Sequence, residues 1–227
     1  MGDSHTDILT RVHIVASRLI ATLERLMGMG NGTTTDLVIL STLDLLQGIL
    51  LLHPASRSLF SREDYMNLLL DLLDGTINPP RVQTQALLVL VTALLDTPAN
   101  TRTFEAVDGL LTVTSLFKSR ATPKEVKMRT LEFLYFYLMP ETPPTTSVSA
   151  PNTALADGKH IVARPPARTH SGDGVGADEM DVDEVTGAAG TTKGTEEKQR
   201  LLGRHLNNVA ELVQDLQENA VFGTPVG

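Results

Sequence analysis

The sequence has no cysteine, no tryptophan and few aromatic residues, which make up 4% of its 227 positions. The lack of cysteine excludes disulfides, thiolate metal sites and a cysteine nucleophile, and it fits a reducing compartment. Basic residues are also scarce, since 19 Lys and Arg stand against 27 Asp and Glu, a net charge of −8. An acidic chain does not attract nucleic acid or anionic lipid through its overall field, so we expect no nucleic-acid partner.

Long apolar runs are missing too. The longest, at 86–91 and 133–139, are far shorter than the roughly 18 residues of a membrane span. The first ten residues are polar and lack the apolar stretch of a secretory signal. We therefore expect a soluble intracellular protein with no membrane insertion.

What the chain does have is leucine, at 35 positions. A chain rich in leucine and poor in aromatics favours packed helices, because leucine keeps its rotamer freedom on a helix. Apolar spacing and turn residues predict helices at 6–27, 36–52, 61–73, 78–95, 98–106, 108–118 and 123–139. The first should bury Ile8, Val12, Val15, Leu19, Leu23 and Leu26. The second is apolar nearly all round, so other helices should cover most of it. Asp36 and the capping-box pattern at 61–64 are candidate helix starts.

An internal repeat suggests how the helices are arranged. Residues 53–60 resemble residues 97–104, so that Pro54 and Phe60 recur as Pro98 and Phe104, 44 residues later. Helical repeats of roughly 40–47 residues belong to the armadillo and HEAT class. The prediction is an all-α fold: a short armadillo/HEAT-like right-handed α-solenoid over residues 1–140. A plain helical bundle is the alternative.

The composition changes at 141–194, where Pro, Gly, Ser, Thr and Ala dominate and acidic residues outnumber basic ones. Such a segment buries too little apolar surface to offset its ordering entropy, which predicts a long disordered insertion. A C-terminal amphipathic helix is predicted at 195–223, with a narrow stripe formed by Leu202, Leu206, Val209, Val213 and Leu216. This helix packs either on the solenoid or on a partner.

Catalytic and metal-binding patterns are not found. The glycines of 28–34 lack the final Gly of a dinucleotide loop and the Lys of a nucleotide P-loop, and the stretch follows a predicted helix. None of the six histidines has another three or four residues away, as a metal pair on a helix would need. We therefore predict no enzyme, no catalytic, cofactor or metal residue, no cofactor and no small-molecule substrate.

A partner-binding surface is predicted from the repeat, since positions one period apart stack into ladders in a solenoid. Steps of 44 link Ser41, Gln85 and Arg129, and also Arg81 with Glu125 and Leu88 with Glu132. The predicted partner-binding residues are Arg81, Gln85, Thr92, Glu125, Arg129 and Glu132. An ordinary solvated face is the alternative. Tyr135 and Tyr137 fill the core or, alternatively, project toward a partner.

Several stretches together resemble one fungal family. They are QGILLLHP at 47–54, SLF at 58–60, RTFE at 102–105, GL at 109–110, LEFLYFYL at 131–138, PE at 140–141, LNNV at 206–209 and FG at 222–223. The chain is similar here to the cell division control protein fourteen family of the septation initiation network. That family is unrelated to the phosphatase of the same name, which needs a catalytic cysteine.

The resemblance implies a non-enzymatic kinase regulatory subunit that binds a germinal-centre-class protein kinase. It implies action in mitotic exit, septum formation and cytokinesis, in the cytoplasm with recruitment to the spindle pole body. The segment from about residue 143 to 194 departs from the shorter family pattern. The alternative function is a general armadillo-like adaptor that binds an extended peptide of another partner.

Overall fold

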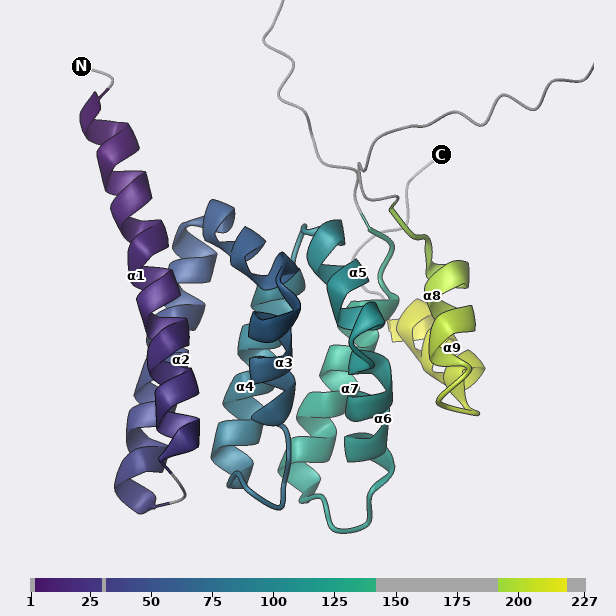
Figure 1. The fold of residues 1–227 in the computed structure, drawn as a ribbon. Coiled ribbons are helices and arrows are strands. Elements are labelled where there is room, and N and C mark those ends of the chain that lie inside the picture. The colour runs from purple at the N-terminus through teal and green to yellow at the C-terminus, as the bar shows by residue number, and fades with distance from the viewer. Residues whose placement is uncertain (1–2, 30–31, 142–191, 220–227) are drawn as a thin grey trace, which may run out of the picture. The chain divides into compact units, whose positions relative to one another are not determined.

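The computed structural model describes residues 3–29, 32–141 and 192–219. Within these ranges all regular structure is helical, which confirms the all-α prediction (Figure 1). The elements are α1 (Asp3–Gly28), α2 (Thr33–Leu52), the 3₁₀ helix η1 (Pro54–Ser61), α3 (Glu63–Asp71), α4 (Pro80–Leu94), α5 (Pro98–Ala106), α6 (Gly109–Lys118), α7 (Lys124–Leu138), α8 (Thr195–Leu202) and α9 (Val209–Asn219). They belong to one compact unit.

Three helices form one layer in chain order, since α4 contacts α2 on one side and α7 on the other. A second layer packs on it, with α1 on α2, α3 on α4 and α6 on α7. Figure 1 shows these pairs side by side. α8 and α9 contact α7. The 44-residue spacing therefore matches successive helix pairs.

The repeat in the sequence is also a repeat of backbone geometry. His53 has φ −130° and ψ 79°, and Thr97, 44 residues later, has φ −131° and ψ 80°. Each precedes a proline that begins a short helix. Phe60 and Phe104 are both fully buried. Likeness at this level supports a repeat, and the assignment to the armadillo/HEAT class with its right-handed sense remains a prediction.

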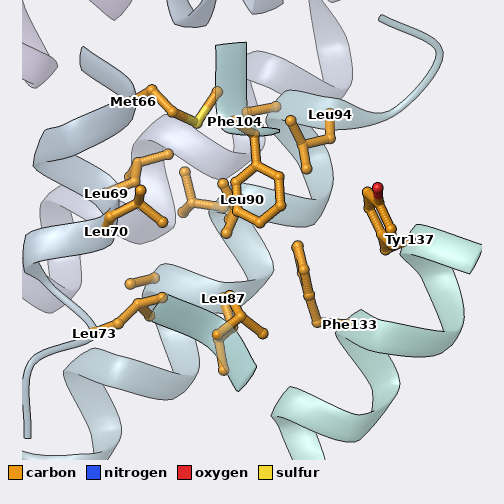
Figure 2. Packing of buried hydrophobic residues seen from close by; sticks show 14 of the residues in the cluster. Met66, Leu69, Leu70, Leu73, Leu87, Leu90, Leu94, Phe104, Phe133 and Tyr137 are labelled. Carbon is orange, nitrogen blue, oxygen red and sulfur yellow. The ribbon is translucent and has the colours of Figure 1, made fainter. Parts of the chain in front are cut away.

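Part of the core lies where α3, α4, α5 and α7 meet (Figure 2). The Phe104 ring lies 5.5 Å from the Phe133 ring and 6.3 Å from that of Tyr137. Gly109 packs so closely on Phe104 that a Cβ there would lie 2.2 Å from a ring carbon. The four-aromatic stretch of α7 is thus largely core, as one of the two alternatives predicted.

Several local predictions were wrong. Ser61 does not cap α3, because its hydroxyl donates to the Ser58 carbonyl and α3 begins at Glu63. Asp36 lies within the first turn of α2, which begins at Thr33. In α1 the fully buried residues are Ala16, Ile20 and Leu23, whereas Val15 is exposed. Helices cover α1 on one side, so only a narrow stripe of its surface is buried. The spacing of apolar residues alone did not determine which side of α1 faces the core.

The prediction that α2 is covered on most sides was also wrong. Its buried residues are Ile39, Thr42, Leu43, Leu46 and Leu50, and leucines on the opposite face are exposed. This helix is long and apolar enough to cross a membrane by length and composition, with a mean hydropathy of 1.7. The core helix of a soluble protein passes the same test, and α2 packs against both α1 and α4.

The predicted C-terminal helix at 195–223 is two helices, α8 and α9, and residues 220–223 lie outside the described ranges. The break at 203–208 contains Gly203, Asn207 and Asn208, which favour turns. Leu206 within it is still buried. Both helices contact α7, so this segment packs on the helical array. Of the predicted disordered insertion 141–194, residues 142–191 lie outside the described ranges.

Candidate functional site

The predicted partner surface is partly exposed. Arg81 of α4 and Glu125 of α7 are exposed. Arg129 Nη1 lies 2.5 Å from Glu132 Oε2 in an ion pair within α7, and the two side chains are 40% and 57% exposed. These four residues present charge of both signs to solvent and could meet a polar partner.

The other two predicted residues lie deeper. Gln85 is half-buried, and its Nε2 donates to Oε1 of Gln47 in α2 at 2.9 Å. Thr92 is 4% exposed, and its hydroxyl donates to the Leu88 carbonyl at 2.8 Å. Thr92 therefore does not lie on the exposed face, contrary to the prediction. The spacing placed it there because it followed helical periodicity without the packing of α2 against α4.

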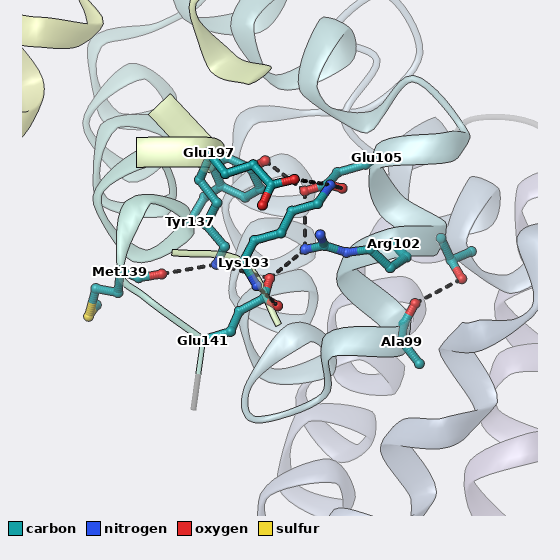
Figure 3. Close-up of polar contacts among 10 residues, drawn as sticks. Ala99, Arg102, Glu105, Tyr137, Met139, Glu141, Lys193 and Glu197 are labelled. Atoms are coloured by element: carbon teal, nitrogen blue, oxygen red, sulfur yellow. Dashed lines mark hydrogen bonds and ion pairs between the residues drawn. The ribbon is translucent and has the colours of Figure 1, made fainter. Parts of the chain in front are cut away.

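A charged cluster that the sequence analysis missed lies where α5, α7 and α8 meet (Figure 3). We call it the Glu141 cluster; its members are Arg102, Glu105, Tyr137, Glu141, Lys193 and Lys198. Glu141 Oε1 lies 2.5 Å from Arg102 Nη2 and 3.2 Å from Lys198 Nζ. Lys193 Nζ donates to Glu105 at 2.7 Å, and the Tyr137 hydroxyl donates to the same carboxylate at 2.8 Å.

The cluster is buried. The Glu141 and Lys198 side chains are only 8% and 5% exposed, and buried charges persist only when they are paired and hydrogen-bonded. Burial lowers the pKa of Lys198, and the nearby Glu141 carboxylate opposes that shift. Burial and the hydrogen bond to Glu105 raise the pKa of Tyr137. These contacts fix α8 to α5 and α7.

The cluster also joins Glu141 to Lys193, two described residues that flank 142–191. The Glu141 backbone N–H donates to the Lys193 carbonyl at 3.1 Å, and the Lys193 N–H donates to Glu141 Oε2 at 3.0 Å. The prediction that 141–194 is disordered throughout was therefore wrong at its ends. The sequence offered one signal, because Pro140 and Glu141 belong to the stretches that carry the family resemblance.

A cavity of about 260 Å³ lies beside the cluster. Its lining is mostly apolar, from residues such as Leu94, Phe136 and Met139, with Glu141 and Lys198 at one side. A larger cavity of about 700 Å³ lies among α3, α4 and α6. Among the described residues, no group of three or more His, Asp or Glu side chains could hold a metal ion. The glycine-containing stretch 28–34 includes the end of α1 and the start of α2, and its residues 30–31 lie outside the described ranges.

Comparison with known proteins identifies the family of this chain. The family model described as "Cell division control protein 14, SIN component" matches residues 12–222. The Cell division control protein 14 of Schizosaccharomyces pombe is 35% identical over 99 residues, which is 44% of this chain and 41% of that relative. No solved structure matches the chain. Because the family model spans α1 to the C-terminal segment, the chain belongs to the Cell division control protein 14 family of septation initiation network components.

Proposed function

We propose that this protein is a non-catalytic scaffold or regulatory subunit that binds a germinal-centre-class protein kinase within the septation initiation network. In that role it acts in mitotic exit, septum formation and cytokinesis. The observation that carries the proposal is the family match over residues 12–222, which covers the helical array rather than one motif within it. The kinase as partner comes from the family resemblance.

The helical array supports a binding role. Paired helices stacked in order leave long faces on which a partner can lie, as in armadillo-like solenoids, and we propose that residues 1–140 have this architecture. The charged side chains of Arg81 on α4 and of Glu125, Arg129 and Glu132 on α7 are exposed or partly exposed, and we propose that they form one such face. We propose that a protein partner contacts this face, while the protein resides in the cytoplasm and is recruited to the spindle pole body.

Affinity capture of the full chain from mitotic cells tests the proposal. One kinase recovered in a stoichiometric amount supports a dedicated subunit. A mixed set of clients with no dominant kinase contradicts it and supports a general adaptor. Imaging the tagged protein through mitosis tests the location, and a signal that never reaches the spindle pole body contradicts that part.

The charged face is tested by reversing two charges together, Arg81→Glu and Arg129→Glu. The matched control reverses Lys118 and Arg120, which are also exposed but lie at the end of α6 and just beyond it. We expect the first double variant to lose kinase binding while its melting temperature stays near that of the wild type, because surface charges contribute little to stability. Equal binding by the two double variants would remove this face from the interface.

A further inference from the structure

One apolar face of α2 is left uncovered by the described helices. It is a stripe at three- and four-residue spacing in which large apolar residues alternate with small ones, and we call it the open face. Its residues are Val38, Ser41, Leu45, Gly48 and Leu52. The exposed fractions of the three large side chains, Val38, Leu45 and Leu52, are 43%, 61% and 88%. An apolar stripe on a helix normally faces another helix.

The same face of α4 shows what such a stripe does in this fold. Gln85 of α4 donates to Gln47 of α2, so this face of α4 points at α2. Val82 and Val89 lie three residues before and four residues after Gln85, on the same face, and both are fully buried. The residues 44 positions earlier are Val38 and Leu45. In α4, therefore, these positions are covered by the preceding helix of the layer.

The matching positions of α7 are covered as well. They are Val126 and Phe133, and both are almost completely buried. Figure 2 shows Phe133 pointing from α7 toward the leucines of α4. Within the described residues α2 has no preceding helix in its layer. The open face therefore has the form of a binding surface for one more helix.

Gly48 is a second, independent sign of a missing neighbour. A Cβ at this position would meet nothing within 4 Å, so the packing of the residues that the structure describes does not need a glycine here. Glycine in a helix interior lowers stability relative to alanine. Its physical advantage is that another backbone can approach closely, and Ser41 on the same stripe is also small.

The charges on α2 indicate which kind of helix would bind to the open face. The sequence of α2 contains Asp36 and Asp44 and no basic residue, and Asp44 is exposed next to Leu45 at the middle of the stripe. A second copy packed antiparallel about Leu45 would bring two Asp44 carboxylates to the same flank, where they repel. The net charge of −8 adds to that repulsion. A helix with a basic flank is complementary instead.

We propose that the open face of α2 binds an amphipathic helix of the kinase, with apolar residues at three- and four-residue spacing and a basic residue opposite Asp44. The identity of the partner rests on the proposed function. The docking mode is a helix laid on an apolar face, which uses repeated apolar anchors.

The test is the affinity of the full chain for the kinase of the same organism, co-expressed and purified. Leu45→Asp and Gly48→Leu should each weaken binding at least about tenfold, since they strike the centre of the interface, and Asp44→Lys should weaken it too. The matched control is Leu111→Asp, a comparably exposed leucine on α6, which should stay within about twofold of the wild type. Gly48→Leu should melt no lower than the wild type, because leucine favours a helix more than glycine does and a Cβ at this position meets nothing within 4 Å. Lost binding with retained stability separates a blocked interface from unfolding.

Three outcomes would overturn the inference. If the wild type binds the kinase and all variants bind equally, the open face is not its site, although the proposed function stands. If the wild type binds no kinase, the proposed function fails, and the named occupant fails with it. If the wild type is a dimer that Leu45→Asp converts to a monomer, a second copy covers the face.

Discussion

Replacing Glu141 with glutamine should destabilise the protein far more than its place beyond the last turn of α7 suggests. The substitution keeps the size of the side chain and removes its charge. In the structure this carboxylate contacts Arg102, Lys198 and the backbone of Lys193. Without it, Lys198 remains almost fully buried with its nearest carboxylate lost.

The magnitude follows from burial. Breaking a buried ion pair by removing one partner costs about 3–5 kcal/mol, because the other charge stays buried without compensation. Since Arg102 and Lys193 are partly exposed and water can solvate them, we expect a loss at the lower end, about 3 kcal/mol. For a chain of this size that loss corresponds to a fall in melting temperature of roughly 6–12 °C. The loss of stability has an upper limit, because α8 can undock and expose Lys198 to water.

Thermal and urea unfolding measure the global effect, and hydrogen exchange of α8 and α9 measures undocking. The matched control is Glu132→Gln, whose carboxylate is also 2.5 Å from an arginine but is 57% exposed. We expect that control to cost less than about 1 kcal/mol. Combining Glu141→Gln with Lys198→Met should recover part of the loss. If Glu141→Gln costs no more than the control and leaves exchange in α8 unchanged, the reasoning from buried charge is refuted.

Three further predictions concern single positions. Gly109→Ala should lower the melting temperature, because the added methyl group would clash with Phe104. Gly48→Ala should stabilise the isolated chain by about 0.5–1 kcal/mol, because a Cβ at that position meets nothing within 4 Å. Similar melting temperatures for the two variants would contradict this. Asn100→Ala should cost about 1–3 kcal/mol in urea unfolding, because its buried amide donates to two backbone carbonyls from different parts of the repeat. The pKa of Tyr137 is raised in the folded protein, so the unfolded chain releases the phenolic proton at a lower pH than the folded chain does. The free energy of unfolding should therefore fall as the pH rises above about 10, by about 1.4 kcal/mol per pH unit for this group. Tyr137→Phe should remove this part of the pH dependence. Urea unfolding of both proteins at about pH 9 and about pH 11 checks it, and parallel losses would contradict it.

The helix content and the repeat were predictable because local signals agree with the packing. Pro54 and Pro98 begin short helices in nearly identical backbone geometry, and proline in the first helical turn is a signal that sequence carries directly. The helices predicted at 98–106, 108–118 and 123–139 were found with shifts of at most one residue. The capping prediction at Ser61 failed because a hydroxyl can choose between the amide ahead of it and the carbonyl behind it.

The Glu141 cluster could not be predicted from sequence. Glu141 and Lys193 lie at opposite ends of a segment whose composition is typical of solvated chain, and a charged residue in such surroundings is normally exposed. Only the meeting of α5, α7 and α8 brings Arg102, Glu105 and Lys198 around them. Contacts between charges 39 to 88 residues apart leave no trace in periodicity.

The repeat also explains why α2 defied prediction. Val82 and Val126 are buried because another helix of the layer precedes α4 and α7. In the sequence Val38 lies 44 residues before Val82, so it occupies the same position of the repeat. Its exposure is a property of position in the array, because among the described helices α2 has a neighbour in its layer on one side only, which is α4. A sequence of repeats encodes what each face can hold, and it does not encode whether a neighbour is present. The apolar surface of α2 is therefore informative: the described helices leave this stripe uncovered, and their packing does not require the glycine within it.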